Sequence, residues 1–168
     1  LEAAGLLAPD GPVNKVLETV VNNLQITNNL DIQPPVRARV LLTTPVESFT
    51  VGNTIVLSRG FVDVLPDEAS LALVLAHELA HIALGHGLDT KYAFNDRSLF
   101  KDEETFMRLS LQRTPAEENA ADKTGIGYLK NSPYKDKLAT ASLFLRALQE
   151  RSAELPRLLR PHLGNQTT

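Results

Sequence analysis

The 168-residue sequence contains no cysteine. This absence excludes disulfide bonds, iron–sulfur clusters, zinc sites built from thiolates and a cysteine nucleophile. A transition metal bound by this chain would therefore need imidazole and carboxylate ligands. Four histidines are available, and three of them, His77, His81 and His86, fall within ten residues.

The sequence also lacks an excess of positive charge and a long apolar run. Its 17 lysines and arginines against 20 aspartates and glutamates give a net charge of -3, so we expect no nucleic acid partner. The longest apolar stretch, 71–84, is interrupted by His77, Glu78 and His81, which predicts no membrane span. The chain does not begin with methionine, so a processed form or an excised domain, with accessory domains in a longer precursor, stays open.

The spacing of apolar residues predicts a mainly helical chain with a small sheet of about three strands. This order of elements indicates a single α+β domain over residues 1–168. The expected elements are a loose lead-in at 1–10, an amphipathic helix at 13–24, strands at 36–42, 49–51 and 54–58 with a turn at Gly52-Asn53, a linker or one helical turn at 60–65, a central buried helix at 66–84, a loop and a helix within 88–113, helices at about 115–129 and 139–155, and a C-terminal tail at 156–168.

The central helix contains His77-Glu78-Leu79-Ala80-His81, which is the HExxH pattern. Residues i and i+4 of a helix share a face, so both imidazoles can reach one ion. Glu78 lies about 100° around the helix from His77, where it can accept a proton from a metal-bound water. Because two histidines and a glutamate are costly to bury without partners, a shared ion explains their place in an apolar helix.

A catalytic zinc needs a third protein ligand and an open position for water. Leu84 and Gly87 stand where the longer HExxHxxGxxH pattern requires glycine and histidine, so a third histidine from that pattern is excluded. The segment Thr114-Pro115-Ala116-Glu117 is a capping-box pattern that predicts the start of a helix. Glu118 and Asp122 are spaced i and i+4 near that start. Glu118 can bind the ion while Asp122 accepts the free N–H of a ligand histidine. The alternative is an ordinary solvated acidic first turn.

The HELAH motif followed by ExxAD resembles the HtpX-like and CAAX prenyl protease family of zinc metallopeptidases, in the gluzincin group. The resemblance covers about 48–129, and the soluble BepA-like branch is the closer comparison. It implies a zincin-like domain with one Zn²⁺ per chain, Glu118 as third ligand, Asp122 as the partner of a ligand histidine, and protein or peptide substrates. Exported relatives favour an extracytoplasmic, periplasmic location.

The resemblance also implies a strand that binds extended substrate as an added strand, with a plain core-edge strand as the alternative. That strand comprises Thr54, Ile55, Val56, Leu57 and Ser58. Three positions depart from the family pattern and bear on substrate preference. Glu47-Ser48 replaces a common Asn-Ala pair, Gly52-Asn53 is shorter than the usual turn, and Lys123 replaces a common arginine.

Two further histidines are candidate site residues. His86 would lie about 140° from the ligand face if the helix continued, so we interpret it as a cap or a partner of a ligand, with a solvated histidine as the alternative. The family carries a C-terminal histidine that approaches the zinc, which makes His162 a candidate catalytic residue; a surface tail histidine is the alternative. His162, Tyr134 and Arg160 are the candidate oxyanion donors.

These features predict a zinc-dependent endopeptidase that hydrolyses peptide bonds of proteins, with Glu78 as general base. The first alternative is an inactive or latent zinc-binding, chaperone-like domain that binds unfolded or partner proteins without cleaving them. In a latent enzyme, residues 88–113 or 156–168 would plug the cleft. The second alternative is a structural helical domain in which HExxH occurs by chance.

Overall fold

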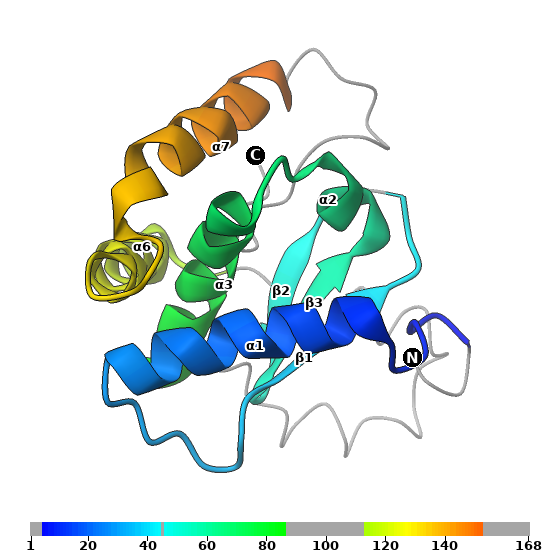
Figure 1. Cartoon of the computed structure of the whole chain (residues 1–168), viewed down its shortest axis with the longest axis horizontal. Coiled ribbons are helices and arrows are strands. Elements are labelled where there is room, and N and C mark those ends of the chain that lie inside the picture. The colour runs from blue at the N-terminus through cyan, green and yellow to red at the C-terminus, as the bar shows by residue number, and fades with distance from the viewer. Residues whose placement is uncertain (1–4, 45, 87–112, 153–168) are drawn as a thin grey trace.

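The computed structural model in Figure 1 describes residues 5–44, 46–86 and 113–152. Within these ranges the fold is α+β with a three-stranded mixed sheet, which confirms the predicted class. The elements are α1 (Pro12–Thr27), β1 (Arg37–Leu41), β2 (Ser48–Val51), β3 (Thr54–Ser58), α2 (Arg59–Val64), α3 (Glu68–Ala83), α6 (Pro115–Lys130), the short 3₁₀ helix η3 (Lys135–Lys137) and α7 (Leu138–Ser152). Of the two alternatives at 60–65, the helical turn is confirmed, because most of this segment belongs to α2. The helix expected within 88–113 and the tail at 156–168 fall almost wholly outside the described residues.

The sheet has the strand order β1-β3-β2. β3 pairs in parallel with β1 and antiparallel with β2, so the last of the three described strands is the central one. The predicted turn between β2 and β3 is confirmed: Val51 pairs with Thr54 across two residues, and Gly52 has a φ of 58°. A positive φ at the first turn residue suits the two-residue hairpin and is readily adopted by glycine.

The two faces of the sheet are buried differently. Side chains of β1 and β3 on one face pack against α1 and α3 in the main core, which includes Leu17, Leu24, Ile55, Leu57 and Leu75. On the other face, Leu41, Phe49 and Val56 form a small separate cluster with Leu7. Strand alternation thus turns Ser48 and Thr50 of β2 toward the same side as Ile55 and Leu57, the side on which α3 lies.

The expectation of a loose lead-in at residues 1–10 is wrong for its second half. The N–H of Ala8 donates to the carbonyl of Val40 at 2.8 Å, and the N–H of Leu42 donates to the carbonyl of Leu6 at 2.7 Å. Leu7 and Leu41 form an antiparallel bridge and pack together. The lead-in therefore covers the outer edge of β1. This pairing gives partners to backbone polar groups that an open strand edge would leave unpaired.

Helix α3 is the central buried helix that the sequence predicts. The carboxylate of Asp67 caps its start by accepting a hydrogen bond from the N–H of Ser70 at 2.8 Å. Its apolar side chains are buried nearly all round, and Figure 1 shows it between the sheet and the two later helices α6 and α7. The helix ends at Ala83, and the chain then turns at Gly85.

Helices α3 and α6 pack against each other almost backbone to backbone. A Cβ atom at Gly125 of α6 would lie 3.0 Å from both the carbonyl oxygen of Ala76 and the backbone nitrogen of His77. Ala121, one turn earlier, is fully buried. Small residues at these positions allow the approach, so the metal-motif helix and the start of α6 are held close together.

Among the residues that the structure describes, no helix combines the length and the apolar character needed to cross a membrane.

Candidate metal centre

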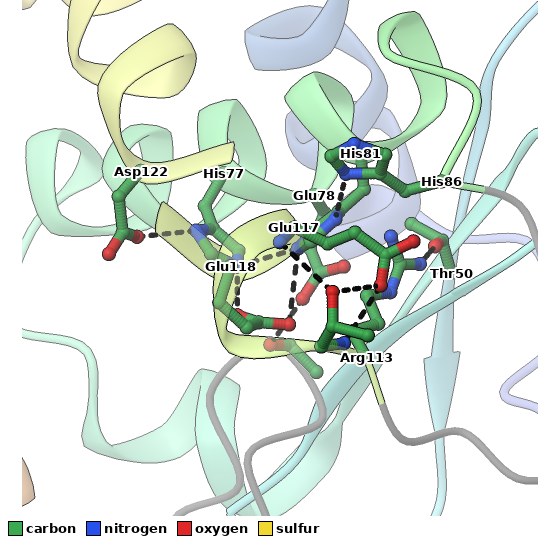
Figure 2. Close-up of polar contacts among 11 residues, drawn as sticks. Thr50, His77, Glu78, His81, His86, Arg113, Glu117, Glu118 and Asp122 are labelled. Carbon is green, nitrogen blue, oxygen red and sulfur yellow. Dashed lines mark hydrogen bonds and ion pairs between the residues drawn. The ribbon is translucent and has the colours of Figure 1, made fainter. Parts of the chain in front are cut away.

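The side chains of His77, His81 and Glu118 meet between α3 and α6 (Figure 2). The Nε2 atoms of the two histidines lie 3.0 Å apart, and the carboxylate oxygens of Glu118 lie 3.3 Å from His77 Nε2 and 3.5 Å from His81 Nε2. Tetrahedral zinc with bonds of about 2.0–2.1 Å separates its ligand atoms by about 3.3–3.4 Å. The three side chains therefore have the spacing and the chemistry of a zinc site.

The carboxylate of Glu118 is buried at this centre. Neither of its oxygens has a hydrogen bond within the described part of the chain, although both lie near the ligand imidazoles. His81 is fully buried, and the side chain of His77 is 18% exposed. A buried carboxylate is unfavourable unless something compensates its charge. A cation bound between the three side chains would compensate it.

Each ligand histidine has a second contact that orients its ring. Nδ1 of His77 lies 2.8 Å from an oxygen of Asp122, so His77 stands between Asp122 and Glu118 (Figure 2). Nδ1 of His81 lies 3.1 Å from Nδ1 of His86, which the turn after α3 brings back toward the helix. In both histidines the contact at Nδ1 leaves Nε2 directed at the centre. This arrangement is typical of metal-ligating imidazoles.

The charges at the centre shift the pKa values of its groups in opposite directions. Burial would lower the pKa of His77, but its contacts with Asp122 and Glu118 prevail and raise that pKa to about 10. Burial would raise the pKa of Glu118, but the two adjacent imidazoles prevail and lower it to about 2. Burial lowers the pKa of His81. Without a metal the centre is therefore an ion pair between His77 and Glu118, beside a neutral His81.

We expect zinc binding to release about one proton per chain at about pH 6. His77 is protonated in the metal-free protein at this pH and must lose that proton to become a ligand. Glu118 is already ionised at this pH, and the lowered pKa of His81 favours the neutral form that ligation needs. Zinc-bound water, with a pKa near 7, contributes little at this pH. Calorimetric titration with zinc, in buffers of different ionisation enthalpy, measures the number of protons. Replacing Asp122 by asparagine removes one cause of the raised pKa and should reduce the release; a wild-type value near zero would contradict the prediction.

Glu78 is fully buried on α3 and lies close enough to both ligand histidines for its charge to favour their protonated forms, although burial still lowers the pKa of His81. One of its oxygens, Oε1, accepts a hydrogen bond of 2.8 Å from the hydroxyl of Ser48 on β2. The other oxygen, Oε2, is buried without a hydrogen-bond partner among the described residues. The motif predicts the position of Glu78, whereas the contact with Ser48 depends on how β2 lies against α3.

Arg113 is a second residue at this centre that the sequence does not reveal. It precedes α6, donates a hydrogen bond to the hydroxyl of Thr50 on β2, and faces the charges of Glu78 and Glu118 (Figure 2). Its Nε and Nη1 atoms are buried without hydrogen bonds among the described residues. Arg113 has no characteristic spacing to the HExxH motif, so only the folded chain identifies it. Thr114, by contrast, forms with Glu117 the capping box that the sequence predicts at the start of α6.

Two expectations about the site need correction, and a third falls outside the described residues. The strand 54–58 cannot receive substrate as an added strand, because β1 and β2 already occupy both of its edges. Tyr134 is not an oxyanion donor at this centre. Its hydroxyl donates to Glu68 at 2.7 Å, and Glu68 begins α3, about 13 Å along the helix from His77. His162 and Arg160 lie outside the described residues.

The model of peptidase family M48 matches residues 10–101, which is more than half of the chain. The chain belongs to this family of zinc-dependent metallopeptidases, whose substrates are proteins or peptides. The match includes the HExxH helix and ends before α6. The geometry of the centre, and not the family match, therefore supports the roles of Glu118 and Asp122. No curated protein matches the chain.

Proposed function

We propose that the chain is a zinc-dependent endopeptidase of the soluble BepA-like branch of the HtpX-like family, with His77, His81 and Glu118 as its zinc ligands. The observation that carries the proposal is the cluster of these three side chains beside the buried carboxylate of Glu78. Burying two carboxylates next to two histidines costs free energy, and a purely structural helix would gain nothing in return. The proposal also agrees with the membership of family M48.

Glu78 acts as general base in this proposal. Bound zinc would supply a Lewis acid that polarises the scissile carbonyl and makes water more acidic. Glu78 accepts a proton from the attacking water as the bond from water oxygen to carbonyl carbon forms. It then delivers the proton to the leaving nitrogen as the C–N bond breaks. The unpartnered N–H groups of Arg113 make it the candidate, within the described residues, for stabilising the developing negative charge.

We propose that an extended substrate pairs with the outer edge of β2. Within the described residues, β3 is paired on both sides and the outer edge of β1 is covered by Leu6 and Ala8, whereas no strand pairs with the outer edge of β2. Antiparallel pairing of β2 with β3 directs the backbone groups of Ser48 and Thr50 toward that edge. The side chains of these residues contact Glu78 and Arg113, so this edge adjoins the centre.

The test is digestion of an unfolded protein by the zinc-loaded chain. We expect about one zinc per chain, internal cleavage of the substrate, loss of cleavage on treatment with a chelator, and recovery when zinc is restored. Identification of the fragments by mass spectrometry distinguishes internal cuts from removal of terminal residues.

Two other outcomes would overturn parts of the proposal. Zinc retention without cleavage would favour the chaperone-like alternative or a latent enzyme. Absence of zinc from protein purified without chelator would favour a structural domain.

A further inference from the structure

The hydrogen bond between Ser48 and Glu78 joins two elements that the chain brings together across 30 residues. Both side chains are buried: Ser48 is 2% exposed and Glu78 is fully buried. A hydroxyl that donates to an ionised carboxylate forms a charge-assisted hydrogen bond, which is stronger and more directional than a neutral one. The contact therefore fixes the rotation of the Glu78 carboxylate relative to α3.

The contact makes the two oxygens of Glu78 different. Oε1 is occupied by the hydroxyl of Ser48, whereas Oε2 is buried without a hydrogen bond to any described residue. A buried carboxylate oxygen without a partner is costly, so a native structure that retains one has a reason for it. An oxygen that must remain free to take a proton provides that reason.

The position of Ser48 on β2 supports the same conclusion. Ser48 and Thr50 are the two β2 side chains on the face toward α3, and both are 2% exposed. Thr50 binds Arg113, whereas Ser48 binds Glu78, so one strand face contacts two different charged groups of the centre. Phe49, between them, points to the opposite face and packs with Leu41 and Val56. That packing fixes the register that presents the Ser48 hydroxyl to Glu78.

We propose that Ser48 is a positioning residue for the general base: it holds Glu78 Oε1 so that Oε2 is the oxygen that accepts the proton from the attacking water. This inference rests on the proposed peptidase function. The side chain of Ser48 touches neither the substrate nor the metal in this scheme, whereas its backbone belongs to the β2 edge proposed to bind substrate. It acts by reducing the orientations of the carboxylate from several to one before the proton is transferred.

The test compares kcat and KM of the zinc-loaded full chain for Ser48→Ala, Ser48→Thr and Ser70→Ala. Ser48→Ala is expected to lower kcat about 10-fold to 100-fold, the range for loss of one hydrogen bond to a charged group, with KM within about twofold of wild type. Ser48→Thr retains the hydroxyl and should keep most of kcat. Ser70→Ala is the matched control, because Ser70 is equally buried on the same helix but lies about 12 Å along α3 from Glu78. It should leave kcat unchanged.

Two readouts other than activity keep the inference separate from the proposed function. Crystal structures of wild type and Ser48→Ala with zinc should show the Glu78 carboxylate rotated in the variant. Unfolding of Ser48→Ala, Glu78→Ala and the double variant should show non-additive effects, because each single change removes the contact. An unrotated carboxylate, additive effects, or a kcat for Ser48→Ala equal to that of Ser70→Ala would overturn the role of Ser48. If wild type binds zinc but cleaves nothing, the peptidase proposal fails, and the structures and the unfolding cycle still decide whether Ser48 orients Glu78.

Discussion

Replacing Glu78 by glutamine is expected to lower kcat about 100-fold to 10,000-fold while zinc stays bound, because a general base contributes a factor of that size. Glutamine has nearly the shape of glutamate but cannot accept the proton of the attacking water. The hydroxyl of Ser48 can still donate to the amide oxygen, so the buried contact and the fold are retained. The ligands His77, His81 and Glu118 are untouched.

The measurement combines steady-state proteolysis with zinc analysis of the same preparation. Glu117→Gln is the matched control, because Glu117 undergoes the same chemical change near the centre, while its carboxylate bonds the N–H and the hydroxyl of Thr114 and none of the ligand residues. Glutamine at this position can also complete the capping box, so helix α6 should remain intact. Equal activity of Glu78→Gln and Glu117→Gln would remove Glu78 from the mechanism.

Replacing Glu118 by glutamine is expected to weaken zinc binding by more than about 100-fold. Loss of a residue that only orients a ligand weakens metal binding by at most about 100-fold, and loss of a ligand itself should have a larger effect. The neutral amide is a poorer ligand than the carboxylate, and it also loses the attraction between the metal and a negative charge. The metal-free protein should lose the ion pair between His77 and Glu118, which lowers the pKa of His77 toward its ordinary value.

A graded series makes this second prediction specific. Asp122→Asn should weaken zinc binding by about 10-fold to 100-fold, since Asp122 contacts His77 and not the metal. Glu117→Gln should leave zinc affinity close to that of wild type. Competition with a zinc-binding dye measures all three constants under the same conditions. If Asp122→Asn proved more damaging than Glu118→Gln, the assignment of Glu118 as the third ligand would have to be abandoned.

Local patterns in the sequence predict much of the centre because its key residues are spaced along single helices. Glu78 and the two histidines lie on one helix, and Glu118 with Asp122 lies on another that begins at a recognisable capping box. Residues three and four apart on a helix are neighbours wherever the helix lies in the fold. The sequence therefore predicts each cluster, and the close packing at Gly125 shows how the two helices meet.

The parts that the sequence does not predict depend on the arrangement of strands. The apolar run 54–58 identifies a strand, but only the folded sheet shows that this strand is central and cannot take a further partner. The roles of Ser48 and Arg113 depend on β2 lying beside α3 and α6, a contact between segments far apart in the chain. The pairing of Leu7 with Leu41 is likewise non-local, so the local sequence of residues 1–10 does not predict it.

The placement of β3 between β1 and β2 also constrains the order in which the protein folds. β2 and β3 are separated by two residues, so their hairpin closes a very short loop and can form in about 1–10 μs. The parallel pairing of β1 with β3 closes a longer loop, which costs more entropy. In addition, the sheet cannot contain both β1 and β2 until β3 lies between them. The hairpin is thus expected to form first and to dock as a unit on β1 and α3. Ser48 reaches the metal-motif helix in that docking step, so completion of the hydrophobic core and orientation of Glu78 belong to the same folding event.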